Sequence, residues 1–136
     1  MPAFVDTNIW VYALTTKEPT RHQQAKALLC SLPCPCINGQ LLRELGRVLL
    51  QKSGIDEAAF RQIILVLAQT CHIVPDTTAA MILASELRVK YGFSYWDSLI
   101  VAAALEGGCE TLYTEDMQHR QVIEGRLTLV NPFAGA

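Results

Sequence analysis

Short apolar segments alternate with longer helical segments along the whole chain, and this alternation limits the folds that the chain can adopt. Candidate strands fall at residues 3–5, 36–37, 72–74, 111–113 and 127–130. Candidate helices fall at residues 8–14, 20–32 and 39–52, from Asp56 onwards, from Thr77 or Thr78 to 91, and at 95–106. Such a pattern predicts an α/β fold with a parallel sheet covered by helices on both faces. Because crossovers between parallel strands are right-handed, we expect the carboxyl ends of the strands along one edge of the sheet.

The length and composition suit one domain, which we expect to span residues 1–136. Of these residues 51% are hydrophobic and 18% are charged, which is enough for a substantial core. No apolar run is long enough to span a bilayer and no signal peptide is evident, so we expect a cytoplasmic protein. A net charge of −2 does not attract nucleic acid, so any such contact needs a local basic patch or metal ions.

The chain carries five cysteines, Cys30, Cys34, Cys36, Cys71 and Cys109. An odd number of cysteines without an export signal favours reduced thiols. No Cys-x-x-Cys pair is present, and the histidines are not spaced as zinc ligands. The pattern therefore favours buried structural cysteines over a zinc site.

Two acidic residues follow predicted strands. Asp6 ends the apolar run at residues 3–5, and Asp116 lies just behind the strand at 111–113. Ligands of open α/β sheets bind at this edge. Each acid also has an ordinary structural role open to it, since Asp6 can cap the next helix and Asp116 can serve in a turn. Glu115 is adjacent, but the strand exit and the Thr-x-Asp spacing favour Asp116.

Two further acids lie on predicted helices. Glu44 lies at the border of the apolar stripe of its helix, where a glutamate can simply reach to water. Asp97 is the only charge in the first two turns of the helix at 95–106, which is apolar almost all round and is therefore expected to be buried. Its structural alternative is the capping box Ser94-x-x-Asp97, and a capping acid can also belong to a site.

These four carboxylates point to one chemistry if the fold brings them together. Carboxylates in one cleft repel, and they raise one another's pKa values unless a cation lies among them. Their oxygen atoms suit Mg²⁺ or Mn²⁺. Such ions activate water and stabilise the charge that builds on a phosphodiester during attack. The residues therefore predict metal-dependent hydrolysis of phosphodiester bonds.

The same residues lie in motifs that resemble a known family. The segments are FVDTN at 4–8, LREL at 42–45, WDSLIVAAA at 96–104 and LYTEDM at 112–117, with closing segments at 122–125 and 130–133. Their order and spacing resemble the PIN-domain ribonucleases, and in particular the toxin subunits of VapBC toxin–antitoxin pairs. The resemblance covers essentially the whole chain and includes all four acidic positions.

The resemblance implies a metal-dependent endoribonuclease that acts as a toxin and a homodimer whose sheet has the strand order 3-2-1-4-5. It implies that Asp6, Asp97 and Asp116 bind Mg²⁺ or Mn²⁺ directly or through water, and that Glu44 binds a second ion or orients the water. Asn8 and Thr114 would hold the carboxylates by hydrogen bonds. A VapB-like antitoxin would inhibit the enzyme by lying in an apolar groove and placing a basic side chain in the acidic pocket. Trp10 and Tyr12 are candidate groove residues, with core packing as the alternative.

The surface that contacts RNA is less defined by sequence. Basic residues that could flank the cleft and follow phosphates are Lys17, Arg21, Arg43, Arg47, Lys52 and Arg120. For each of them, an ordinary solvated surface charge is the alternative. His119 is a weaker candidate, because loops carry many polar residues without function.

Three other functions are compatible with parts of this pattern. A phosphatase of the haloacid-dehalogenase type needs a second Asp two residues after the first, where this chain has Asn8. A response-regulator receiver needs an Asp after the third strand and a Lys after the fifth, where this chain has Pro75 and Asn131. A PIN-fold module that binds RNA or protein without turnover stays open, although four intact acids argue against it.

Overall fold

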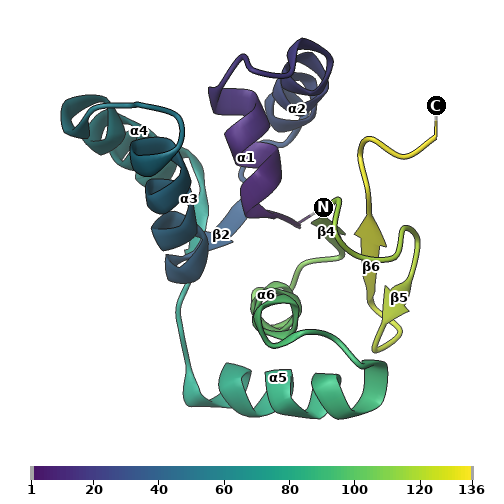
Figure 1. The fold of residues 1–136 in the computed structure, drawn as a ribbon. Coiled ribbons are helices and arrows are strands. Elements are labelled where there is room, and N and C mark those ends of the chain that lie inside the picture. The colour runs from purple at the N-terminus through teal and green to yellow at the C-terminus, as the bar shows by residue number, and fades with distance from the viewer. Residues whose placement is uncertain (1, 136) are drawn as a thin grey trace.

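The computed structural model describes residues 2–135, and within this range six strands and six helices form around one mixed sheet (Figure 1). The strands are β1 (Ala3–Val5), β2 (Cys36–Asn38), β3 (His72–Val74), β4 (Thr111–Tyr113), β5 (Val122–Ile123) and β6 (Leu127–Val130). The helices are α1 (Thr7–Leu14), α2 (Pro19–Ser31), α3 (Gly39–Gln51), α4 (Glu57–Thr70), α5 (Thr78–Tyr91) and α6 (Tyr95–Glu106). The α/β class that the sequence predicts is therefore confirmed.

The sheet has the order β3-β2-β1-β4-β6-β5. The five strands expected from the sequence pair in parallel and in the expected order, with Leu127–Val130 as the fifth of them. Strand β5, which was not predicted from the sequence, pairs antiparallel with β6 at the edge of the sheet. A strand of two residues is too short to show a period of two in its side chains.

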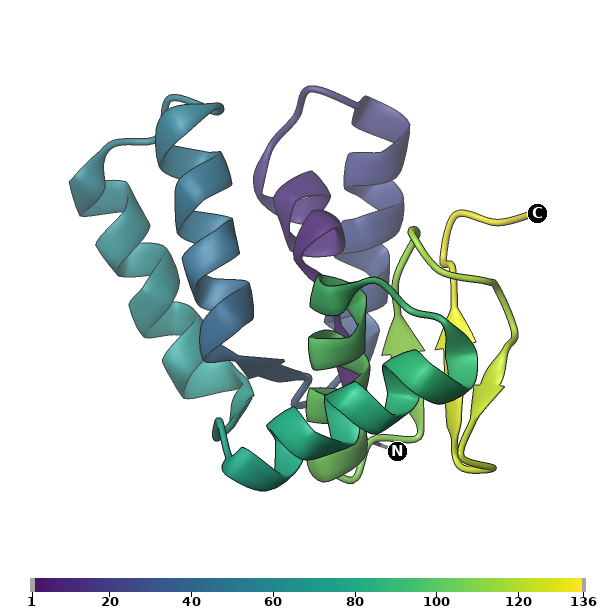
Figure 2. The same ribbon diagram turned by 60° about the horizontal axis from the view of Figure 1, so that its bottom comes forward.

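The helices form two groups around the sheet. Helix α1 packs against α2 and α3, and α3 packs against α4. Helices α5 and α6 pack against each other, and α5 crosses α6 in Figure 2 while α6 contacts β3 and β4. The central strand β1 is buried along its whole length. The backbone of Asp6, which follows this strand, is therefore held in a fixed position.

Most helix boundaries match the sequence prediction, because the cap residues that were recognised do cap their helices. Asp56 and Thr77 accept hydrogen bonds from backbone N–H groups at the starts of α4 and α5. The start of α2 was predicted wrongly, since Thr20 is inside the helix and Glu18 precedes it without a side-chain cap. Pro19 occupies the first turn instead, where its fixed φ angle suits a helix and its missing N–H is not needed.

Helix α6 is less uniformly buried than its composition suggested. Residues 100–105 are buried, but Tyr95 and Trp96 in the first turn are 46% and 61% exposed. The expectation of a helix buried on most sides is therefore wrong for its first turn.

The cysteines are free thiols, and only some are buried. Cys36, Cys71 and Cys109 are buried as expected, whereas Cys30 and Cys34 are exposed. Across residues 2–135, no helix is long and apolar enough to cross a membrane.

Candidate active site

Asp6 lies at the junction between β1 and α1, where the buried strand turns into a helix. Its Oδ1 accepts a hydrogen bond from the backbone N–H of Thr7 at 2.7 Å, and its Oδ2 accepts one from the Thr114 hydroxyl at 3.0 Å. The residue is only 9% exposed. The cap and the candidate site acid are therefore the same carboxylate, held in one orientation from two sides.

Burial raises the pKa of Asp6 to about 6, because removal from water disfavours the ionised form. The hydrogen bonds from Thr7 and Thr114 act in the opposite direction, and the negative charges of Asp116 and Glu44 raise the pKa further. Asp6 is thus within electrostatic reach of two acids that are 110 and 38 positions away in the sequence.

Asp116 reaches the same place from the end of β4. Val5 and Tyr113 are partners in the parallel β1–β4 register, so both strands end side by side. The Asn8 side-chain amide donates a hydrogen bond to Asp116 Oδ2 at 3.2 Å. Burial raises the pKa of Asp116, and the charges of Glu115 and Asp97 add to this effect.

Glu44 is held over this edge by α3. Its Oε2 accepts a hydrogen bond from the Thr7 hydroxyl at 3.1 Å, and its Oε1 accepts one from the Gln40 side chain at 3.3 Å. Neither Thr7 nor Gln40 was predicted from the sequence as a partner of Glu44. Gln40 lies four residues before Glu44, so the helical period could have identified it, whereas nothing local links Thr7 to α3.

Asp97 lies in the first turn of α6. Its backbone N–H donates to the Ser94 hydroxyl at 3.2 Å, which is the cap that the sequence predicted. Its charge acts on Asp116, so α6 brings the fourth carboxylate to the group. We call Asp6, Glu44, Asp97 and Asp116 the acidic cluster.

Glu115 differs from its neighbour Asp116 because its charge is compensated. The Arg21 guanidinium lies 2.7 Å from one of its oxygens, and the Tyr12 hydroxyl donates to the other at 2.7 Å. The geometry therefore favours Asp116 as the site acid. It also places Arg21 in an ion pair with Glu115.

Several other candidate residues have structural positions. Trp10 is 6% exposed and donates from Nε1 to the Val5 carbonyl, so it has the core-packing role that was the alternative to a groove residue. Tyr12 is partly buried against Phe133 and Glu115. The Nδ1 atom of His119 accepts a hydrogen bond from the Asn131 N–H, which ties a loop to the end of β6. Exposed basic residues that remain available are Lys17, Arg43, Arg47, Lys52 and Arg120.

The donor set of the acidic cluster suits a hard cation, but the side chains are not arranged around one. Among residues 2–135, no three His, Cys, Asp or Glu side chains are close enough together to hold a metal ion directly. Carboxylates bound to Mg²⁺ commonly act through its water shell, which tolerates a wider spacing. Burial is the main cause of the raised pKa values of Asp6 and Asp116, and the charges of neighbouring carboxylates add to it.

Known structures share this fold. A crystal structure of Mycobacterium tuberculosis VapC20, described as a sarcin–ricin loop cleaving toxin, is 24% identical with a TM-score of 0.70 over 84% of this chain and 89% of that one. A toxin–antitoxin complex from Klebsiella pneumoniae is 22% identical, with a TM-score of 0.74 over 96% and 98% of the two chains. VapBC2 from Rickettsia felis, bound to promoter DNA, is 19% identical, with a TM-score of 0.66 over 96% and 100%.

No curated protein matches the sequence of this chain. The family model described as PIN domain matches residues 3–124, which include the whole acidic cluster and all strands except the last. On this match, the chain belongs to the PIN domain family.

Proposed function

We propose that this PIN domain is a metal-dependent endoribonuclease that acts as a toxin and is neutralised by an antitoxin protein. The observation that carries the proposal is Asp6, a buried carboxylate at a strand end whose pKa is raised to about 6 and is influenced by Asp116 and Glu44. A fold keeps such an unfavourable arrangement where function requires it. Carboxylates grouped at the carboxyl ends of parallel strands are suited to binding a cation and a phosphodiester.

Within this proposal, Asp6, Asp97 and Asp116 hold Mg²⁺ or Mn²⁺ directly or through water, and Glu44 binds a second ion or orients the attacking water. The bound ion would supply an activated water and stabilise charge on the phosphodiester. Thr114 and Asn8 fix the orientations of Asp6 and Asp116 by hydrogen bonds. Thr7 and Gln40 do the same for Glu44.

The antitoxin part rests on charge and on similar structures. The Klebsiella pneumoniae protein is a toxin–antitoxin complex, and the Mycobacterium tuberculosis protein is a toxin that cleaves the sarcin–ricin loop. A basic side chain from a VapB-like antitoxin would offset the charge of the acidic cluster and exclude metal from it. We further propose RNA as the substrate, a homodimer as the assembly and the cytoplasm as the place of action.

RNA turnover with and without Mg²⁺ or Mn²⁺ tests the enzyme directly. Wild type is expected to cleave RNA with the ion and to stop when a chelator is added. Asp6→Asn and Asp97→Asn should abolish cleavage while far-UV circular dichroism stays unchanged. Glu106→Gln is the matched control, because it removes an exposed carboxylate at the opposite end of α6 from Asp97. Equal cleavage by all four proteins, or cleavage that survives the chelator, would refute the proposal.

A binding module without turnover is the second candidate. It is favoured by the spacing of the donors, since no three of them in residues 2–135 can hold an ion directly. Such a module would bind RNA with the same affinity with and without Mg²⁺ and would cleave none. The turnover assay therefore separates the two candidates.

A further inference from the structure

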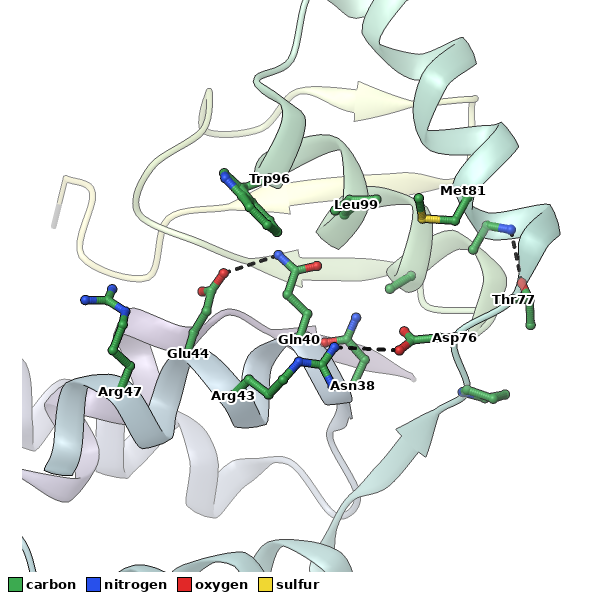
Figure 3. Close-up of a pocket in the computed structure, with 13 residues that line it drawn as sticks. Asn38, Gln40, Arg43, Glu44, Arg47, Asp76, Thr77, Met81, Trp96 and Leu99 are labelled. Atoms are coloured by element: carbon green, nitrogen blue, oxygen red, sulfur yellow. Dashed lines mark hydrogen bonds and ion pairs between the residues drawn. The ribbon is translucent and has the colours of Figure 1, made fainter. Parts of the chain in front are cut away.

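A pocket of about 790 Å³ lies beside the acidic cluster and has no role in the proposed hydrolysis (Figure 3). It is bounded by α3 on one side and by the loop after β3, α5 and α6 on the other. Glu44 belongs both to its wall and to the acidic cluster, so the two sites adjoin. This volume is within the range of about 300–1,000 Å³ that small organic groups occupy in proteins.

Trp96 forms one wall of the pocket and is held in an exposed position. Its ring is 61% exposed, although a side chain of this size is usually buried. Tyr95 contacts it in a T-shaped arrangement at 5.1 Å. The Arg88 guanidinium lies 4.9 Å from the centre of the Tyr95 ring and donates to the buried Ser98 hydroxyl at 3.0 Å. The contact with Tyr95 thus supports the Trp96 ring, and the exposed part of this ring is available to a ligand.

Two arginines on α3, Arg43 and Arg47, line the opposite wall, together with Glu44 of the same helix and Asp76 of the loop after β3. The side chains of Arg43 and Asp76 are 3.8 Å apart, but both are more than two-thirds exposed, so this pair is weak and can exchange for another anion. Arg47 lies one turn further along the helix and is exposed. An aromatic ring with cations a few residues away is the combination by which proteins bind single-stranded nucleic acid.

We propose that this pocket binds an unpaired RNA base next to the cleaved phosphate, with the base stacked on Trp96 and the flanking phosphates on Arg43 and Arg47. The position next to the cleaved bond rests on the proposed nuclease function. It is supported by the lining of the pocket, because Trp96 lines it together with Glu44 of the acidic cluster and directly precedes Asp97 in the sequence. Moving a base out of a duplex costs free energy for unpairing and unstacking, so the pocket selects single strands, loops or bulges.

Binding is measured on the full chain by fluorescence anisotropy, with a short unstructured RNA of A and U in chelator so that nothing is cleaved. Trp96→Ala is expected to weaken binding by about 5- to 100-fold, as loss of one stacked base does in other proteins. Trp96→Phe should retain most of the affinity, because it keeps an aromatic face. Leu65→Ala is the matched control, since Leu65 is 54% exposed on α4 and does not line the pocket.

Arg47→Gln and the tryptophan signal give independent readouts. Arg47→Gln removes one of the proposed phosphate contacts, so the slope of log affinity against log salt concentration should decrease in magnitude by about 0.7. The chain has two tryptophans and Trp10 is buried, so RNA should quench the Trp96 emission and protect it from acrylamide. The same RNA as a duplex should bind more weakly and quench less.

The outcomes separate this inference from the nuclease proposal. Wild-type affinity and unchanged cleavage positions in Trp96→Ala would overturn the base pocket while leaving hydrolysis intact. Loss of antitoxin binding with unchanged RNA affinity would also overturn it and assign the pocket to a protein partner. Trp96-dependent RNA binding by a wild-type protein that cleaves nothing would support base binding and overturn hydrolysis.

Discussion

Asp6 illustrates how one side chain can both stabilise a helix and weaken the fold. Its Oδ1 caps α1, which favours the folded state, while burial of the same carboxylate raises its pKa to about 6. In the unfolded chain the pKa has its ordinary value of 3.8. Between these two values the folded state holds the proton more tightly, so folding is most favoured by Asp6 at low pH.

Asp6→Asn is therefore expected to stabilise the metal-free protein near neutral pH, by roughly 1–3 kcal/mol. Wild type should lose stability as the pH rises from about 4 to about 6, because its unfolded state releases the proton first. Asn has no proton to release but can still accept from the Thr7 N–H. Urea unfolding in chelator at several pH values measures the difference, with Glu106→Gln as the control. An Asn variant that is less stable than wild type at every pH would contradict this account.

At the level of single residues, the sequence identified the candidate site residues better than the residues that they contact. Asn8 and Thr114 contact the acids that the resemblance suggested, and Ser94 caps α6 as its spacing predicted. The Arg21–Glu115 pair joins residues 94 positions apart, so no local pattern could reveal it. That contact nevertheless decides which of the two adjacent acids has its charge compensated.

Helix α3 shows how an element places a site residue. Asn38 ends β2 and also caps α3, with its side-chain oxygen accepting from the Leu41 N–H at 3.0 Å. Leu41, Leu45 and Leu49 are fully buried and fix the rotation of the helix about its axis. Because Glu44 lies beside this stripe, it faces the acidic cluster.

Asn38→Ala should destabilise the protein by about 1–2 kcal/mol, because the buried N–H of Leu41 loses its partner. RNA cleavage should fall as well, since the first turns of α3 carry Glu44. Asp56→Ala is the matched control, because it removes the same kind of cap from α4, which carries no acid of the cluster. Urea unfolding and turnover are compared at a temperature where all proteins are folded. Equal loss of activity in both variants would show that cap loss, and not the position of Glu44, is responsible.

The sequence predicted most helices and strands but not how much of each is buried. Strand residues and helix caps are local signals, which is why β1, β3, β4, β6 and α6 have the expected bounds. Exposure of Trp96 depends on how the helices pack against one another, and this is a property of the assembled fold. Composition alone made α6 look uniformly buried.

At the level of the whole molecule, convergence of the acidic cluster follows from topology for two of its members. Parallel pairing of β1 with β4 brings Asp6 and Asp116 to one edge, and the alternation of strands and helices was sufficient to predict this. Glu44 and Asp97 reach the same edge through helix packing, which the hydrophobic pattern of the sequence does not predict. Their placement was expected only from the resemblance to PIN domains.

Because the four acids meet only in the folded chain, a divalent cation should bind the native state and not the unfolded one. Mg²⁺ or Mn²⁺ at about 100 times its dissociation constant would add about 3 kcal/mol, which should raise the melting temperature by roughly 5–10 °C. Sodium chloride of equal ionic strength should raise it much less, since screening relieves buried repulsion poorly. Asp6→Asn and Asp97→Asn should lose most of the increase, and Glu106→Gln should keep it. A wild-type protein whose thermal unfolding is unaffected by either ion would show that the carboxylates gather here for a purpose other than metal binding.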